Sequence, residues 1–512
     1  MSKNNFNLML TFQKTGVHGS FCAMNGILSE ISLEQYIRSI NSNGNIENEK
    51  EITKRWKETF VEIINISEKL SELTLKIIGV SRKHAFSLHE KESNENDENN
   101  ENNENHDVED ISGDKTDQII CSWLAMKELL TLLTNILQQV KFQYTYIIDK
   151  EHQIQKKDFL ILPPDDIERI GRLMINLILN TRHKGVIERG EEQFERYCEI
   201  LTEIQYKEIS SLKTKWMNEL FQTFFEYDTA VLRRSGALPP IFLSLLRTEK
   251  QGIAGETPKD GMIQTTINRL LEYARLNVVN EKNQELLQSF QLNLQKISTE
   301  NTSIKSKIIK VFSSIPTDAA IDESTTIHSL NILRAIFRDS VLSKASSEYL
   351  LEGFLLSLYR YNANHWEIRN AGSLCYTTLI SKTLFSKTKP DKRVVFVIAR
   401  DFFNQIPGMY QFLLNFFGNQ NTNHTFISQT YQQAEEKKSQ ENKLESNHYL
   451  HSPMLYPILL LLSSIHPNPF ELPNEKYSMN PFKPYLFHCL SSQDFMIRNF
   501  SIENFSSFNL QK

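Results

Sequence analysis

The most distinctive chemical feature of this chain is the octapeptide 233–240, in which two adjacent arginines are followed closely by two prolines. Arg233 and Arg234 place two guanidinium groups side by side, and such groups can bind phosphate oxygens through paired hydrogen bonds. The alternative is a kinked pair of helices in which both arginines are merely solvated, and both interpretations stay open. Pro239 and Pro240 have no backbone N–H to donate, so a helix that arrives from the N-terminal side must kink or stop here. The apolar residues that follow can begin a second helix on the geometry set by the prolines.

A second basic cluster comprises Arg182, His183 and Lys184, and Gly185 follows it. The preceding residues have helical periodicity, and cations stabilise the last carbonyls of a helix. Gly185 fits a left-handed cap at that helix end. Helix-end electrostatics therefore explains the cluster without any RNA, and we prefer that interpretation.

A third segment, residues 328–339, carries arginines at helical spacing. Leu330, Leu333 and Phe337 share one side of the expected helix, and Asn331, Arg334 and Arg338 share another. The polar stripe can bind a row of phosphates, or it can be a solvated face that bonds to neighbouring helices. Both interpretations stay open, because Asp339 is the only acidic residue close by in sequence and cannot pair with both arginines.

Sequence motifs typical of enzymes are absent. The chain has no Gly-x-Gly-x-x-Gly, no Walker-type loop, no His-Glu-x-x-His and no Gly-x-Ser-x-Gly. Its five cysteines are scattered without a Cys-x-x-Cys pair, which indicates a reducing compartment and no zinc site. We therefore expect a binding protein without metal or cofactor of its own.

The net charge of −5 is concentrated in one tract. Residues 90–117 hold twelve acidic side chains and two lysines, a local charge of −10, so the rest of the chain carries +5. This mildly basic remainder is compatible with contact to an RNA backbone. The longest apolar run, residues 454–462, is too short to span a membrane, so we expect a cytoplasmic protein.

Apolar residues recur at three- and four-residue steps along most of the chain, for example at Trp123, Met126 and Leu130. This periodicity predicts helices throughout, and a HEAT/armadillo-like α-solenoid as the all-α fold class. The best strand candidate is 394–398, whose apolar character fits a buried helix segment equally well. We expect helical repeats at 1–89, 118–417 and 448–512, and disordered polar insertions at 90–117 and 418–447.

A weak internal repeat supports the solenoid. Segments 230–235, 366–371 and 495–500 share an aliphatic residue followed by arginine, a polar residue and a small or apolar residue. Such a segment often begins the second helix of a HEAT-type repeat, with its arginine bonding along a ladder of neighbouring repeats. Trp366 is large enough to fill the space between neighbouring repeats, and we expect it to pack there.

The order Arg-Arg-Ser-Gly-Ala-Leu-Pro at 233–239 resembles the Arg-Arg-Ser-Ala-Gly-Leu-Pro signature of the thyroid adenoma-associated (THADA) family, with Gly236 and Ala237 transposed. Other segments similar to that family extend the resemblance over most of residues 123–499. They are 121–128, where we expect Trp123 to pack in the core, and 181–185, 328–339, 366–371 and 453–459. Members of the family are usually far longer than this chain.

The resemblance implies a non-catalytic scaffold for tRNA methylation. Its partner would be an FtsJ-type methyltransferase that holds S-adenosylmethionine and modifies the ribose 2'-hydroxyl of the first anticodon-loop residue, position 32. The residues expected to bind tRNA or this partner are Arg233, Arg234, Ser235, Gly236, Leu238, Pro239, Arg334, Arg338, Asn331, Arg182, His183 and Lys184. The alternative is a HEAT-type protein adaptor, for transport or a phosphatase, whose basic stripes bind acidic peptides without RNA.

Overall fold

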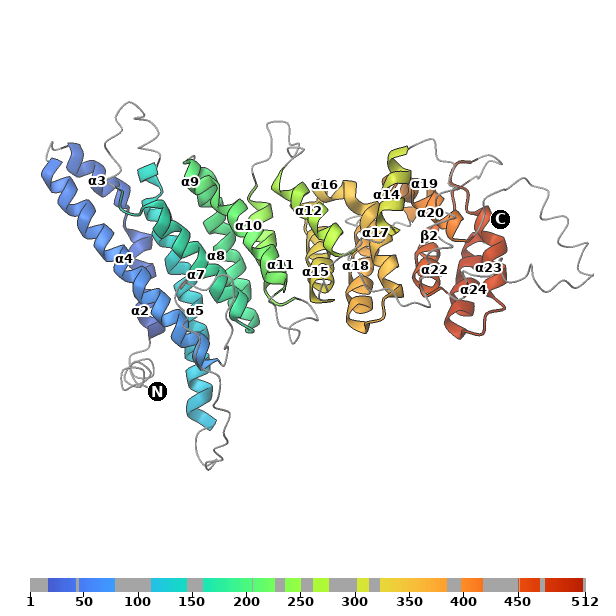
Figure 1. The fold of residues 1–512 in the computed structure, drawn as a ribbon, viewed down its shortest axis with the longest axis horizontal. Helices are drawn as coiled ribbons and strands as arrows, with labels where there is room; N and C mark the ends of the chain where they lie inside the picture. The colour runs from blue at the N-terminus through green and yellow to red at the C-terminus, as the bar shows by residue number, and fades with distance from the viewer. Residues whose placement is uncertain are drawn as a thin grey trace, which may run out of the picture. The chain divides into compact units, whose positions relative to one another are not determined.

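The computed structural model describes most of the helical part of the chain (Figure 1). The described residues are 17–42, 46–78, 112–144, 160–204, 206–225, 235–249, 261–275, 302–312, 323–384, 397–417, 450, 452–469 and 475–509. They divide into two compact units, of which the first comprises Met1–Tyr227 and Gly236–Pro258 and the second Asp228–Ser235 and Lys259–Lys512. The backbone passes from the second unit to the first between Ser235 and Gly236, inside the octapeptide.

The described part of the first unit is made of helices. They are α2 (Val17–Glu30), α3 (Leu33–Ser42), α4 (Ile46–Ile77), α5 (Ser112–Val140), α7 (Pro164–Asn180), α8 (Lys184–Glu203), α9 (Lys207–Ser210), α10 (Leu212–Gln222), the 3-10 turn η2 (Thr223–Phe225) and α11 (Leu238–Arg247). One row consists of α2, α5, α8 and α11, each in contact with the next, and α4 and α7 form a second row beside it. Two rows of successive helices are the arrangement expected of a helical-repeat stack.

The core of the first unit depends on large side chains that close the space between rows. Trp216 of α10 is fully buried and lies against Phe194 and Tyr197 of α8, with ring centroids 6.1 and 6.4 Å apart. Its indole also covers Gly171 of α7, where an added Cβ would overlap the ring. The apolar residues whose spacing predicts α5, α7 and α8 lie mainly on the side that each helix buries, so the prediction of these helices is confirmed.

The second unit continues the helical pattern. Its elements are α12 (Met262–Tyr273), α14 (Thr302–Phe312), α15 (Glu323–Arg338), α16 (Ser343–Ser346), η4 (Ser347–Tyr349), α17 (Leu350–Tyr359), η5 (Arg360–Asn362), α18 (Trp366–Leu384), β1 (Val397–Ile398), α19 (Ala399–Gln405), α20 (Met409–Phe416), α22 (Leu455–Ser463), β2 (Ile465–His466), η7 (Asn480–Phe482), α23 (Lys483–Cys489) and α24 (Phe495–Asn509). Here α12, α15 and α18 form one row, while α14 packs on α17 and α22 on α24.

Extended structure in the described ranges is limited to one short parallel pair. Val397 lies opposite Ile465, and Ile398 lies opposite His466. The strand candidate 394–398 is thus borne out at its last two residues, and α19 follows at once. The all-α fold class is confirmed, and each unit is built as a stack of helices.

Two of the three copies of the internal repeat, 366–371 and 495–500, lie wholly within the described residues. In both copies the arginine has a role other than the predicted one. Trp366 begins α18 and Phe495 begins α24. The Nη1 atom of Arg369 donates to the carbonyls of Ala363 (2.8 Å) and Asn364 (2.6 Å), and that of Arg498 donates to Ser492 and Gln493 (both 2.8 Å). Each arginine therefore fixes the turn before its own helix, so the predicted ladder between repeats is wrong for these two residues.

Exposure corrects the predicted role of the first residue in each copy. The side chain of Trp366 is 59% exposed and that of Phe495 is 67% exposed. A residue that solvent reaches to this extent cannot fill the space between repeats, so Trp366 is no packing anchor. The arginine of the third copy, Arg233, lies outside the described residues.

Helix α5 modifies two expectations. It begins at Ser112, inside the range 90–117 expected to be an insertion, so the helical block starts earlier than predicted. Its stretch Gln118–Tyr144 is long and apolar enough to cross a membrane by length and composition alone. This stretch contacts α2, α4, α7 and α8, and helices so surrounded carry apolar residues because they lie in a core. The insertion expected at 418–447 falls outside the described residues.

Candidate nucleic-acid interface

Residues 235–240 of the octapeptide form a tight turn and the start of a new helix. Ser235 and Gly236 have φ angles of 60° and 52°, in the left-handed region. Helix α11 begins two residues later at Leu238, with Pro239 and Pro240 in its first turn. A helix start tolerates proline because the first N–H groups lack partners in the helix. The prediction that a second helix starts on the prolines is confirmed.

Ser235 joins this turn to the helix that carries the arginine stripe. Its side chain is fully buried, and its Oγ lies 2.8 Å from Nδ1 of His328 and accepts a hydrogen bond from Nδ2 of Asn331 at 3.0 Å. Since the hydroxyl accepts from Asn331, its own proton can be donated to His328. We call Ser235, His328 and Asn331 the buried polar joint. It brings together two segments that sequence analysis treats separately.

A serine beside a histidine has the appearance of a nucleophile and its base. Both side chains of this pair, however, have 0% exposure. A substrate has no access to groups buried in this way. The pair therefore satisfies buried polar atoms and stabilises the fold, which is the usual role of such interior hydrogen bonds.

Burial also corrects the expected binding role of several other residues. Leu238 and Pro239 are buried in the first turn of α11, and Asn331 is 3% exposed. None of these side chains, nor Ser235, lies where it could contact RNA or a protein in this structure. Gly236 is half-buried. Arg233 and Arg234 lie outside the described residues, so their expected contact with RNA stays a prediction.

The stripe expected on residues 328–339 does not form as one surface. Asn331 points into the buried polar joint, and Arg334 is half-buried with its Nε donating to Oγ1 of Thr378 at 3.3 Å. Arg334 therefore bonds to the neighbouring helix α18, as the alternative interpretation expects. Arg338 alone is exposed, at the last residue of α15, where a cation stabilises the helix end.

The cluster Arg182, His183 and Lys184 lies at the start of a helix as well as after the end of one. Helix α7 ends at Asn180 and α8 begins at Lys184, so Gly185 lies within the first turn of α8. Among the described glycines, Gly236 and Gly408 have φ angles in the left-handed region, and Gly185 does not. The predicted left-handed cap at Gly185 is therefore wrong. Cations destabilise the N-terminal end of a helix, and helix-end electrostatics does not account for Lys184.

Trp123 of α5 completes this site. Its ring stacks on His183, with centroids 4.0 Å apart and planes at 22°. Trp123 is half-buried, so the prediction that it packs in the core is only partly right. Lys127, one turn further along α5, lies close enough to restrict Gly185: an added Cβ there would be 3.0 Å from its Nζ. Trp123 and Lys127 are four residues apart, and this spacing could have identified them from sequence as one helix side.

The electrostatics of the site favour an anion. Arg182 and Lys184 are exposed, and the first turn of α8 contains no acidic residue. Lys184 has a partner in Glu188 at 3.3 Å, but both side chains are more than half exposed, and such pairs are weak. Burial, and then the charge of Lys127, lowers the pKa of the His183 imidazole. We call Arg182, His183, Lys184, Trp123 and Lys127 the basic turn.

A basic turn of this kind can bind a phosphate. Free backbone N–H groups at a helix start point toward bound anions, and nearby lysine and arginine side chains add charge. Half-exposed aromatic rings additionally provide a surface on which a nucleic-acid base can stack. The described part of the chain thus holds one surface with the chemistry expected of an RNA contact.

Comparison with known proteins identifies a family over most of the chain. The family described as THADA/TRM732, DUF2428 matches residues 58–367, and the family described as Trm732, C-terminal TPR repeats matches residues 369–509. No solved structure matches the chain. The second match describes its helical repeats as TPR repeats, so the more specific HEAT/armadillo assignment stays a prediction.

Curated relatives share low identity over a long stretch. The tRNA (32-2'-O)-methyltransferase regulator THADA of Canis lupus familiaris is 23% identical over 74% of this chain and 16% of its own length. The tRNA (32-2'-O)-methyltransferase regulator trm732 of Schizosaccharomyces pombe is 25% identical over 74% of this chain and 20% of its own length. The regulator THADA of Drosophila melanogaster is 21% identical over 90% of this chain and 24% of its own length. The chain spans about one sixth to one quarter of the length of these relatives.

Proposed function

The chain belongs to the THADA/TRM732 family, and from that premise we propose that it is a non-catalytic subunit that supports 2'-O-ribose methylation of tRNA residue 32. The observation that carries the proposal is the name shared by relatives from animals and fission yeast, each described as a regulator of this methyltransferase. A regulator needs no reactive centre of its own. The burial of the serine–histidine pair agrees with that role.

The physical role we assign is to place the substrate. Methyl transfer to a ribose hydroxyl depends on the position and orientation of the reacting groups, and an error of about 1 Å can cost most of the rate. Stacked helices supply a rigid support, because each contacts its neighbours over a long apolar side. Such a support can hold tRNA at a fixed angle to a separate methyltransferase.

The basic turn is the contact that we assign to tRNA. Arg182, Lys184 and Lys127 carry charges that suit backbone phosphates, and Trp123 offers a ring for an unpaired base of the anticodon stem-loop. Arg338 is a candidate for a second phosphate contact. Arg233 and Arg234 remain part of the proposal on the strength of the sequence resemblance alone.

The partner and the compartment are also proposals. The partner is a methyltransferase of the FtsJ type that holds S-adenosylmethionine, and it binds a surface other than the basic turn. The complex works on tRNA in the cytoplasm. The relatives support the existence of a methyltransferase partner, since their names describe its regulation.

Rescue of ribose methylation in cells tests the proposal. Cells that lack their own regulator of this family would receive the full chain or a variant, and methylation at residue 32 would be measured by mass spectrometry. We expect the chain to restore methylation, and the variants Arg182→Ala/Lys184→Ala and Arg233→Ala/Arg234→Ala to restore less at equal protein levels.

A charge-matched control separates local contact from net charge. Arg38→Ala/Arg55→Ala removes two exposed cations that pair with Glu34 and Glu51 of their own helices, and it should rescue fully. Failure of the wild-type chain to restore any methylation would overturn the proposed function. Co-purification of acidic proteins without tRNA would instead support the protein adaptor.

A further inference from the structure

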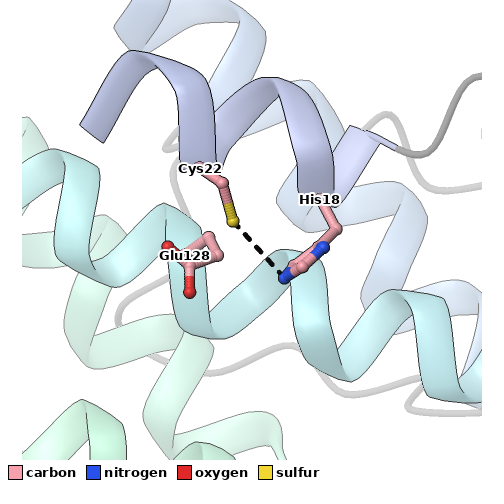
Figure 2. A group of neighbouring side chains, drawn as sticks. All are labelled: His18, Cys22 and Glu128. Atoms are coloured by element: carbon pink, nitrogen blue, oxygen red, sulfur yellow. Dashed lines mark hydrogen bonds between the residues drawn. The ribbon is translucent and has the colours of Figure 1, made fainter. Parts of the chain in front are cut away.

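Three side chains with metal-binding atoms meet between α2 and α5, apart from the basic turn. His18 and Cys22 are one helical turn apart on α2, so both lie on the same side, and Glu128 of α5 faces them (Figure 2). Nε2 of His18 lies 3.5 Å from Sγ of Cys22, and one ligand atom from each of the three lies within 4.8 Å of the others.

The separation of the nitrogen and sulfur atoms suits a zinc ion. Zinc binds thiolate sulfur at about 2.3 Å and imidazole nitrogen at about 2.0–2.1 Å, and a tetrahedral angle then places the two atoms about 3.6 Å apart. The observed 3.5 Å is close to that value. Magnesium and calcium prefer sets made of oxygen atoms, so the mixed nitrogen, sulfur and oxygen set points to a transition-type cation.

Neighbouring amides hold the carboxylate of Glu128 in place. Nδ2 of Asn25 donates to Oε2 of Glu128 and to its backbone carbonyl, both at 3.0 Å. Asn135 donates in turn to Oδ1 of Asn25 at 3.1 Å. These bonds fix the orientation of the carboxyl group, which lies beside the thiol and the imidazole (Figure 2). Metal ligands are typically oriented by such outer hydrogen bonds.

We propose that His18, Cys22 and Glu128 form a site for a zinc-type divalent cation that ties α2 to α5. Binding converts the thiol of Cys22 to the thiolate, and its proton is released to water. Three protein ligands leave a fourth tetrahedral position for a water molecule or for a ligand from a partner. The cation strengthens the attachment of the first helices of the stack, because it bonds to both.

Cobalt binding tests the site directly in the full chain. Cobalt(II) replaces zinc and gives a thiolate-to-metal charge-transfer band that reports a cysteine ligand. We expect metal-free protein to show this band on titration with cobalt, and zinc to abolish it by displacement. Cys22→Ser should remove the band, His18→Ala should weaken cobalt binding, and Asn25→Ala should weaken it by about tenfold or more.

A second cysteine of the same region serves as the control. Cys121 of α5 is a free, half-buried cysteine outside the cluster, and Cys121→Ser should keep the band. Circular dichroism of each variant verifies that the helices have formed. No charge-transfer band in the wild-type chain, or an unchanged band in Cys22→Ser, would overturn the proposal. Neither readout involves tRNA, so the outcome is separate from that of the methylation test.

Discussion

The octapeptide and the basic turn both carry adjacent cations in sequence, but the polar side chain that the structure describes in the first is buried, whereas two cations of the second are exposed. In the octapeptide the described polar side chain, that of Ser235, faces inward and bonds to His328 and Asn331. In the basic turn, the side chains of Arg182 and Lys184 face solvent beside a half-buried ring. The first arrangement stabilises the fold, and the second leaves charge available for a ligand.

The difference arises from the backbone around each site. A left-handed pair of residues turns Ser235 into the second unit, where a serine hydroxyl can satisfy two interior polar groups. Thr181 and His183, between α7 and α8, have extended backbone angles, and the side chains of Arg182 and Lys184 are exposed. Backbone conformation and packing therefore decide which of the described polar side chains are buried and which are exposed.

Loss of the Ser235 hydroxyl should have the largest effect on stability. Ser235→Ala removes a hydrogen-bond partner from His328 and Asn331 inside the protein, and we expect the free energy of unfolding to fall by about 1–3 kcal/mol. Urea denaturation followed by circular dichroism measures the change. Ser67→Ala is a matched control, because that buried hydroxyl bonds to the carbonyl of Ile63 in its own helix. Equal stability of Ser235→Ala and wild type would contradict the structural role.

The next largest effect is expected from two glycine substitutions, which compare the backbone conformation of the octapeptide with that beside the basic turn. Gly236→Ala places a Cβ in a left-handed conformation and should cost about 1–2 kcal/mol of stability. Gly185→Ala lies inside α8, where alanine favours helix, but its Cβ would lie 3.0 Å from Nζ of Lys127, so that flexible side chain must shift. These two effects oppose each other, and we expect stability to change by less than about 1 kcal/mol. Thermal unfolding of both variants makes the comparison. A loss in Gly185→Ala as large as that in Gly236→Ala would contradict the difference in backbone conformation between the two glycines.

The smallest effect concerns the ionisation of His183. Burial and Lys127 lower its pKa below the ordinary value of 6.5, so the folded state prefers the neutral imidazole. As pH falls below about 6.5 the unfolded chain takes up this proton first, and the contribution of His183 to stability decreases. Histidine NMR titration should show the low pKa, and Lys127→Ala should raise it only in part, because burial is the larger cause. Titration of His183 at or above 6.5 would contradict its burial beside Lys127.

Much of the fold follows from local patterns in the sequence. Three- and four-residue apolar steps predicted α5, α7 and α8, and the proline pair predicted the start of α11. These features depend on neighbours within one or two helical turns. The start of α5 at Ser112 does not follow from such patterns, because a first helical turn made of polar and charged residues resembles a loop in sequence.

The candidate site was harder to predict because burial depends on distant contacts. Helical spacing predicts that Asn331 shares a side of α15 with Arg334. Asn331 is nevertheless buried, because it bonds to Ser235, which lies far away in the sequence. The stack of Trp123 on His183 joins two helices in the same way. The sequence gives no sign of the cluster of His18, Cys22 and Glu128 for a similar reason, since Glu128 meets the other two only when α2 packs on α5.

Binding of tRNA to the purified chain as salt is raised tests the central claim, that the basic turn contacts RNA, most directly. The logarithm of affinity falls with the logarithm of salt concentration in proportion to the number of phosphates that the protein neutralises. For Arg182→Ala/Lys184→Ala we predict a slope smaller by about 2 than that of wild type, while Arg38→Ala/Arg55→Ala leaves it unchanged. Equal slopes for the wild-type chain and Arg182→Ala/Lys184→Ala would contradict the account.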